Sequence, residues 1–193
     1  MTLLDQRLDK LEDEIKKPSF RQNRGLSNEV GYYIFDYPAE DELNVRKRIE
    51  YIKNKNESSA DEYTIQVFDL YEIMIEILKS KGRLEKCFDL EKSKGFEKVS
   101  HGISSLLQVN STDGLIIKYI EERLKEKSIV FITGIGKCYP IMRSHTILNN
   151  LHLVIDYVPV VMFYPGKYTG QELVLFDGEI KDDNYYRAFK IVE

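Results

Sequence analysis

Cysteine is scarce in this sequence, which excludes two ways of holding a small protein together. Cys87 and Cys138 are the only two among 193 residues, and they lie far apart in the chain. A disulfide framework and a cysteine zinc site are therefore excluded as organising features, and two unpaired thiols fit a reducing cytoplasm. A chain of this length buries roughly 70% of its unfolded surface when it folds as one unit. We expect residues 1–193 to form a single domain that needs no metal and no disulfide.

Long apolar runs and an excess of positive charge are also missing. No stretch approaches about eighteen consecutive apolar residues, and Met1–Arg7 places charge where a signal peptide needs its apolar run. We therefore expect no secretion, no contact with a membrane and a cytoplasmic location. The 28 basic residues are outnumbered by 32 acidic ones, which gives a net charge of −4. Because there is no global basic field to hold phosphates, a free-standing DNA-binding protein is disfavoured.

The apolar residues that are present, 42% of the chain, follow the periods of helices and strands. Between residues 4 and 15, leucine and isoleucine recur at intervals of four and three with charged residues between them. This spacing predicts an amphipathic helix. Pro18 ends it, because proline disfavours helix in the preceding residue and has no N–H group to donate. We expect residues 1–17 to pack as a helix on the protein body or against a partner.

Strands and helices alternate through the rest of the chain. The predicted strands are Gly31–Tyr37, Tyr63–Phe68, Ser128–Thr133, Val158–Tyr164 and Leu173–Phe176. Gly31–Tyr37 and Ser128–Thr133 lack polar alternation, which is typical of strands covered on both faces. The predicted helices run from Pro38 toward Asn54, over Leu70–Lys79, within Gly102–Gln108, over Asp113–Lys127 and from about Pro140 to Ile155, with a loop at Lys53–Glu62 and a lysine-rich connection at Arg83–Lys98. This order predicts a Rossmann-like α/β fold with a mainly parallel sheet flanked by helices.

The C-terminal edge of this sheet is expected to differ from the rest. Pro165–Gly166 should break the fourth strand, and Tyr168–Gly170 forms a turn before the next one. A short turn between consecutive strands favours antiparallel pairing. We therefore predict an antiparallel edge at the C-terminal end of the chain.

A glycine turn follows the strand that ends at Thr133, because Thr133–Cys138 holds two glycines. Such a turn between a strand and a helix can hold phosphate through backbone N–H groups. The specific nucleotide motifs fail: Phe131 and Cys138 stand where a Walker loop needs a glycine and a hydroxyl, and Tyr139 stands where a dinucleotide fingerprint needs its third glycine. Glycines that simply permit a tight turn are the favoured interpretation, with phosphate binding as the alternative.

Two carboxylates, Asp36 and Asp69, close the first two predicted strands. If those strands are neighbours in a parallel sheet, both carboxylates lie in the crevice where α/β proteins place ligands. Paired carboxylates can hold magnesium or transfer protons. Capping is the simpler use of an aspartate at such a place, and we favour it.

Arg143, His145 and Asn149 fall on one predicted helix, with His145 and Asn149 on the same face. A histidine near an arginine could serve phosphoryl chemistry. No nucleophile elbow accompanies them, and the histidines lack metal-ligand spacing. Structural hydrogen bonding or an interface is therefore favoured for these three residues. We predict no catalytic residue, no metal and no cofactor.

Basic residues gather in Lys79–Lys98, where seven of them accompany four acidic residues. Such a stretch is usually a solvated surface, and nucleic-acid contact is the alternative. That alternative requires salt-dependent DNA binding that is lost when Lys81, Arg83 and Lys86 are reversed in charge.

Aromatic residues form two groups near the C-terminus, in Tyr164–Tyr168 and in Asn184–Phe189. Tyrosine and arginine anchor many protein interfaces, because each combines contact area with a polar group. The alternative is that these side chains hold the C-terminus on the edge of the sheet. Because side chains alternate along an extended segment, we predict that Tyr185, Arg187 and Phe189 pack inward. The candidate interface or ligand residues in the two groups are Tyr164, Lys167, Tyr168, Tyr185, Tyr186 and Arg187.

Several segments, mostly in the last third of the chain, are similar to one protein family. They are Val130–Gly136, Tyr139–His145, Leu148–Leu151, Pro159–Gln171 and Asp183–Phe189. These segments resemble the small BrxB component of BREX bacteriophage-exclusion systems, over residues 128–193 and more loosely in the N-terminal helix and Gly31–Tyr37. The resemblance implies a bacterial cytoplasmic protein that works beside an ATPase, an alkaline-phosphatase-like protein and an adenine-specific DNA methyltransferase in blocking phage. It supplies no catalytic residues to carry over.

Two functions remain open at this point. The first is a non-enzymatic adaptor of the exclusion complex that binds its alkaline-phosphatase-like and ATPase components and meets DNA at most indirectly, through the complex. The second is a nucleotide- or phosphate-binding switch, or a hydrolase, that acts at the carboxyl ends of the strands through the two aspartates, the Thr133–Gly136 turn and Arg143. Direct DNA binding is the least favoured, because the net charge is acidic.

Overall fold

The computed structural model describes residues 1–22, 31–176, 181–182 and 188–193. Its strands are β1 (Tyr32–Tyr37), β2 (Thr64–Asp69), β3 (Ser128–Thr133), β4 (Val160–Tyr168), β5 (Leu173–Leu175), β6 (Lys181–Asp182) and β7 (Phe189–Lys190). The central sheet is parallel and has the order β2-β3-β4-β1-β7. β5 pairs antiparallel with the end of β4, and β6 pairs antiparallel with β5. The predicted α/β fold, with a mainly parallel sheet and an antiparallel C-terminal edge, is confirmed.

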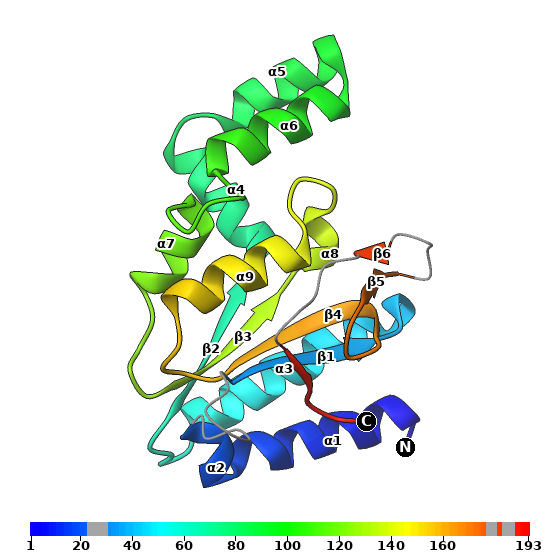
Figure 1. The fold of residues 1–193 in the computed structure, drawn as a ribbon, viewed down its shortest axis with the longest axis vertical. Coiled ribbons are helices and arrows are strands. Elements are labelled where there is room, and N and C mark those ends of the chain that lie inside the picture. The colour runs from blue at the N-terminus through cyan, green and yellow to red at the C-terminus, as the bar shows by residue number, and fades with distance from the viewer. Residues whose placement is uncertain (23–30, 177–180, 183–187) are drawn as a thin grey trace.

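Helices cover both faces of the sheet (Figure 1). They are α1 (Leu3–Lys16), α2 (Pro18–Arg21), α3 (Glu42–Glu57), α4 (Leu70–Ser80), α5 (Leu84–Lys94), α6 (Phe96–Leu107), α7 (Leu115–Glu121), α8 (Ile135–Cys138) and α9 (Ser144–Val154), with a 3₁₀ turn at Ala39–Asp41. α1 and α3 pack on one face, and α4, α7 and α9 pack on the other. None of the described helices combines the length and apolar character that a membrane span requires.

The core consists of two apolar layers, one on each side of the sheet. In β3, Ile129 and Phe131 point into the layer under α1 and α3, whereas Val130 and Ile132 point into the layer under α4 and α9. All four side chains are fully buried. A strand buried on both faces needs apolar residues at nearly every position, which explains why β3 lacks polar alternation.

Helix α1 is the amphipathic helix that the leucine spacing predicts. It begins with a capping box, in which the Thr2 hydroxyl accepts the Asp5 N–H and the Asp5 carboxylate accepts the Thr2 N–H. Its apolar stripe, which includes Leu11 and Ile15, packs into the layer shared with α3 and the sheet. Of the two expected packing partners, the helix therefore lies on the protein body.

The prediction that Arg83–Lys98 is a connecting segment is wrong. These residues form α5 and the first turn of α6, and the two helices make an antiparallel pair joined by Gly95 alone (Figure 1). The stripe that holds α5 in place is narrow, with one apolar residue every third position at Leu84, Cys87 and Leu90. Lysines and glutamates surround these three residues in the sequence, so the spacing of the apolar residues is hard to recognise as helical.

Three predicted helix boundaries are also wrong. α3 continues into the predicted loop as far as Glu57, because the buried Asn56 carboxamide bonds the Tyr63 carbonyl and the Ile65 N–H and so joins the helix end to β2. α7 stops at Glu121 instead of running to Lys127, and its end tightens into bonds between residues three apart. α9 begins only at Ser144, because the backbone before it is extended, and the short α8 precedes it.

The predicted break at Pro165–Gly166 is wrong as well, because β4 runs through both residues to Tyr168. The pairing of β4 with β3 ends at Met162, and its pairing with β5 begins at Gly166. Pro165 stands between these two partners, where a missing N–H group does not interrupt the ladder on that side. The continuous strand carries Tyr164 and Tyr168 into the core.

Candidate functional site

The polar residues at the carboxyl ends of the strands lie on strands that are not neighbours. Asp36 is on β1 and Asp69 is on β2, and the sheet order places β3 and β4 between them. A shared crevice for the two carboxylates requires adjacent strands, so that hypothesis is wrong. Each aspartate instead has its own partners.

Asp36 is buried, with 6% of its surface exposed, and it binds groups from three other parts of the chain. Its Oδ1 accepts a hydrogen bond from Arg7 Nη2 at 2.6 Å, and its Oδ2 accepts the Tyr168 N–H at 3.0 Å and lies 3.3 Å from Lys190 Nζ. Arg7 also donates to the main-chain carbonyls of Asp36 and Val192. Asp36 therefore joins α1, the end of β4 and the C-terminal residues to β1, and the favoured capping interpretation is wrong for this residue.

Asp69 caps helix α4, as the simpler interpretation of this residue predicts. Its Oδ1 accepts the N–H groups of Tyr71 and Glu72 at 3.0 and 3.1 Å, which satisfies the first turn of the helix. Its Oδ2 accepts a hydrogen bond from Lys137 Nζ at 2.8 Å. Both oxygens of Asp69 are thus engaged inside the protein.

The glycine turn after β3 is shaped by this aspartate. Gly134 has a left-handed backbone with φ of +78°, and a Cβ atom there would lie 2.4 Å from Asp69 Oδ1. Only glycine satisfies both requirements. Lys137, the lysine of the turn, bonds Asp69 and lies 5.0 Å from the centre of the Tyr71 ring. The geometry therefore supports the tight-turn interpretation.

Cys138 follows the turn and is fully buried. Burial, with a smaller contribution from Asp69, raises the pKa of its thiol to about 12. A thiol with this pKa is protonated at neutral pH and is a poor nucleophile. Within the described ranges, no three His, Cys, Asp or Glu side chains are grouped as metal ligands.

The candidate residues Arg143, His145 and Asn149 lie at α9 and just before it. Arg143 precedes the helix and is exposed, His145 is half-buried in its first turn, and Asn149 is exposed one turn later. Arg143 borders a cavity of about 20 Å³ that Tyr139 and Tyr164 also line. This volume holds roughly one water molecule and is far too small for a nucleotide. A ligand or interface role for these residues stays a prediction.

The candidate residues of the two aromatic groups differ in their exposure to solvent. Tyr164 and Tyr168 are buried, and the Tyr168 hydroxyl donates to the Ala188 carbonyl at 2.6 Å, which holds the C-terminal segment against β4. Lys167, between them, is exposed. This arrangement favours the structural alternative for the two tyrosines. Tyr185, Tyr186 and Arg187 lie outside the described residues. Phe189 is described and has 41% of its surface exposed, so the prediction that it packs inward is wrong.

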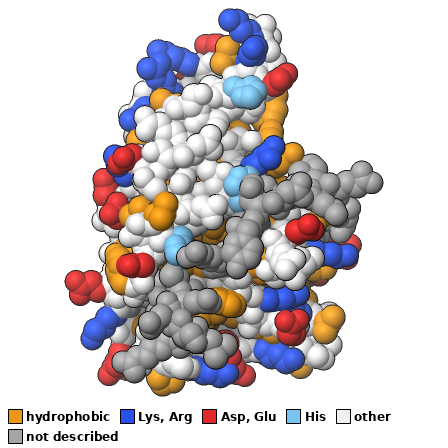
Figure 2. All heavy atoms as spheres, in the orientation of Figure 1, with side chains coloured by type: hydrophobic (Ala, Val, Ile, Leu, Met, Phe, Trp, Pro, Cys, Tyr) orange, Lys and Arg blue, Asp and Glu red, His pale blue; other side chains and the backbone are white. Residues whose placement is uncertain are grey.

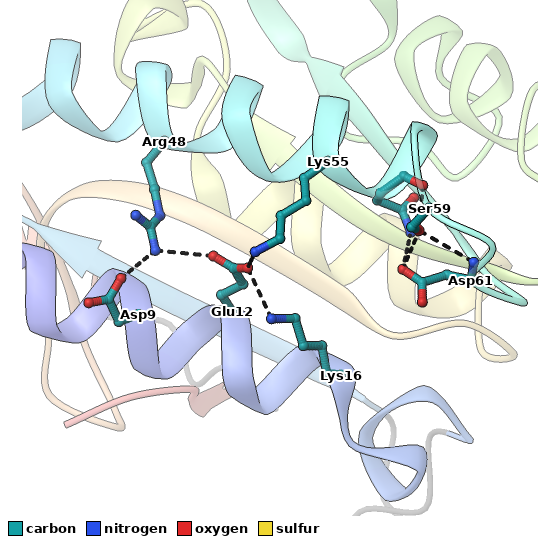
Figure 3. Close-up of polar contacts among 8 residues, drawn as sticks. Asp9, Glu12, Lys16, Arg48, Lys55, Ser59 and Asp61 are labelled. Atoms are coloured by element: carbon teal, nitrogen blue, oxygen red, sulfur yellow. Dashed lines mark hydrogen bonds and ion pairs between the residues drawn. The ribbon is translucent and has the colours of Figure 1, made fainter.

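Sequence reasoning missed an ionic cluster between α1 and α3, centred on Glu12 (Figure 3). Glu12 Oε1 accepts hydrogen bonds from Lys16 at 3.0 Å and Lys55 at 2.5 Å, and Oε2 accepts one from Arg48 at 3.1 Å. Arg48 also pairs with Asp9. Burial alone would raise the Glu12 pKa, but the hydrogen bonds from Lys55 and Lys16 and the positive charges of these lysines together hold the pKa below its usual value. A signal was present, because Glu12 stands four residues after Leu8 on the apolar stripe.

Sequence reasoning also missed two exposed aromatic residues on the pair of helices α5 and α6, which we call the α5–α6 hairpin. Phe88 on α5 and Phe96 at the start of α6 have 46% and 48% of their surfaces exposed. Lysine and arginine side chains gather at the end of the molecule that this hairpin forms (Figure 2). The signal in the sequence was that Phe88 falls outside the three-residue period of Leu84, Cys87 and Leu90, and that Phe96 directly follows Gly95 among lysines.

Comparisons with family models and with known proteins all identify the same family. The family model for BrxB, described as BREX protein BrxB, matches residues 66–191. The chain is 50% identical over 195 residues to a BREX protein BrxB of Bacillus cereus (strain H3081.97), with 100% of both chains covered. It is 31% identical over 190 residues to a BREX protein BrxB of Escherichia coli O9:H4 (strain HS), with 98% of this chain and 92% of that protein covered. No solved structure matches.

Proposed function

Since the chain belongs to the BrxB family of BREX proteins, we propose that it serves phage defence as a non-enzymatic adaptor that binds other components of its BREX system. The family membership confirms the resemblance seen in the sequence and supports a role in phage defence. The adaptor role goes further and is our proposal. We propose the alkaline-phosphatase-like and ATPase components as its partners, with DNA met only through the complex, and we propose that residues 1–193 work as one domain in the cytoplasm.

The proposal rests on one observation: the carboxylates at the ends of β1 and β2 are already bound by other groups of the protein. Asp36 is bound by Arg7, Lys190 and the Tyr168 N–H, and Asp69 is bound by the first turn of α4 and by Lys137. A switch or hydrolase at this edge would need these groups for a ligand. Since they are already bound within the protein, they support a scaffold role better than a reaction.

The alternative of a nucleotide- or phosphate-binding switch has less support. The lysine of the glycine turn points to Asp69, and the cavity beside Arg143 has room for about one water molecule. Thermal unfolding with nucleotides and magnesium tests it directly. A ligand at a hundred times its Kd adds about 2.7 kcal/mol of stability. We expect no such shift, and a shift with any nucleotide would favour the switch.

Co-purification tests the adaptor role itself. The tagged chain is co-expressed with each other component of its own BREX system, one at a time and then together. We expect at least one component to elute with it in a defined complex on size-exclusion chromatography. A variant that keeps the fold but lacks exposed candidate side chains, such as Arg143→Ala with Asn149→Ala, then shows whether α9 contributes. If the chain elutes alone with every component at micromolar concentration, the adaptor proposal is wrong.

A further inference from the structure

We propose that the α5–α6 hairpin docks onto an acidic surface of a protein partner, with Phe96 and Phe88 as apolar anchors and the surrounding lysines as charge contacts. This inference rests on the proposed adaptor function and names the surface and the chemistry of the partner. It differs from the candidates Tyr164, Lys167 and Tyr168, because these lie on β4, away from the end of the molecule that the hairpin forms (Figure 1).

The first support is the unusual burial of α5. Among the α-helices that the structure describes, α5 alone buries none of its residues, whereas α6 buries Val99, Ile103 and Leu107. α5 therefore lies on the outside of α6, held by the partly buried Leu84, Cys87 and Leu90. α5 contacts both α6 and α4, and most of its residues are exposed to solvent.

The second support is the pair of exposed phenylalanines. Contact between a phenylalanine ring and water is unfavourable, because the ring is apolar. About half of the surface of Phe88 and of Phe96 is nevertheless exposed. Phe96 stands at the tip of the hairpin, directly after Gly95. Aromatic side chains that enter a recess of a partner supply much of the energy of protein interfaces.

The third support is charge. Lys92 and Lys94 in the last turn of α5 and Lys98 in the first turn of α6 surround Phe96 in the chain, and all three are exposed. Lys79–Lys98 carries a surplus of three positive charges in a chain of net charge −4, so the other residues carry a surplus of seven negative charges. Within the described residues, none of the basic side chains of this segment forms an ion pair; they are Lys79, Lys81, Arg83, Lys86, Lys92, Lys94 and Lys98.

A protein with carboxylates around an apolar recess fits these features better than a nucleic acid does. The phosphate backbone is a continuous polyanion, and it would meet Glu85, Asp89 and Glu91 on α5 as well as the acidic remainder of the chain. A protein surface can place carboxylates only opposite the lysines and leave apolar groups for the phenylalanines. The two anchors, rather than charge alone, would then set the affinity.

Binding measurements on matched variants test the proposal. The probe is the BREX component that co-purifies with the full-length chain, titrated against the parent, against Phe88→Ala with Phe96→Ala, and against Lys92→Glu with Lys94→Glu and Lys98→Glu. The charge control reverses three exposed lysines elsewhere, Lys10→Glu, Lys47→Glu and Lys125→Glu. The apolar control truncates Leu43 and Leu153, which are 66% and 75% exposed, to alanine. Thermal unfolding of every variant checks the fold.

We expect each hairpin variant to weaken binding about tenfold or more and each control to bind like the parent. The affinity of the parent should fall as salt rises, and the lysine variant should lose most of this dependence. If a component binds but the folded hairpin variants bind it unchanged, the docking surface is wrong and the adaptor function stands. If no component binds, both proposals are wrong. If the parent binds a labelled DNA duplex and the lysine variant does not, the partner is nucleic acid and the protein partner is wrong.

Discussion

Helices α1 and α3 and the α5–α6 hairpin are both helix pairs rich in charge, but they use that charge differently. Between α1 and α3, the Glu12 carboxylate gathers Lys16, Lys55 and Arg48, and the neighbouring Asp36 holds Arg7 against β1. On the described hairpin, the basic side chains have no carboxylate partner. Removing one partner of a buried ion pair leaves an uncompensated charge and destabilises the fold, whereas exposed lysines without a carboxylate partner contribute little to it and are available to another molecule. The comparison predicts that charge changes harm folding on the first surface and binding on the second.

The largest effect should come from Asp36→Ala. The substitution leaves the Arg7 guanidinium and the Lys190 ammonium close together without their counter-charge, and it leaves the Tyr168 N–H without its acceptor. We expect the free energy of unfolding to fall by about 3 kcal/mol, the scale for breaking a buried ion pair. Urea unfolding measures it, with the exposed Asp13→Ala on α1 as the control. Equal midpoints for the two variants would show that this cluster does not stabilise the fold.

Glu12→Gln should have the next largest effect, about 1–2 kcal/mol at neutral pH, because a neutral amide replaces a buried carboxylate bonded to charged donors. Its pH dependence has a definite sign. Folding lowers the Glu12 pKa below its ordinary value of 4.5, so the contribution is full above that value and is lost as the pH falls through the lower, native pKa. The difference between parent and variant should therefore close only in acid. A difference that instead widens below pH 4.5 would contradict this assignment.

Gly95→Ala tests how much the turn between α5 and α6 contributes to the stability of the hairpin. Gly95 has φ of +78° and ψ of 169°, a conformation that costs a residue with a Cβ atom about 1–2 kcal/mol, and no atom lies within 4 Å of the added carbon. Gly102→Ala inside α6 is the matched control and should raise stability by about 0.5–1 kcal/mol, because alanine is the better helix former. Thermal unfolding compares the two. If both variants melt alike, the Gly95 turn does not constrain the hairpin.

The smallest effect should come from Phe88→Ala with Phe96→Ala. Each ring is about half exposed, so we expect the free energy of unfolding to change by less than about 0.5 kcal/mol per ring. Guanidinium unfolding of the double variant measures the change beside the parent. A loss well above this amount would mean that the rings hold the hairpin together, and a binding defect in the same variant would then have a structural cause.

The layers of the fold were predictable because their signal is local. The range Ser128–Thr133, predicted from an uninterrupted apolar run, is the observed extent of β3, since a strand covered on both faces needs such a run. The order of the strands in the sheet has no comparable local signal in the sequence. Asp36 and Asp69 both end strands and look equivalent in the sequence, yet β3 and β4 separate them.

The candidate site was less predictable, because the partners of its residues are distant in the chain. Arg7 reaches Asp36 from 29 residues away, and no period or motif connects the two. The continuation of β4 through Pro165 depends on its change of partner from β3 to β5, which also lies outside any local pattern. Capping by Asp69 was predictable, because it requires only the residues that immediately follow it.

The pairing of β1 also sets the order in which the fold can be completed during synthesis. β1 is the first strand to leave the ribosome, yet its neighbours are β4 and β7, with Tyr32 opposite Val160 and Tyr33 opposite Phe189. Both edges of this apolar strand therefore stay unpaired until the last third of the chain has been made. A nascent or truncated chain that ends before β4 presents two unpaired edges, which are templates for pairing with other chains. We therefore expect newly made protein to be most prone to aggregate just before its final strands are translated.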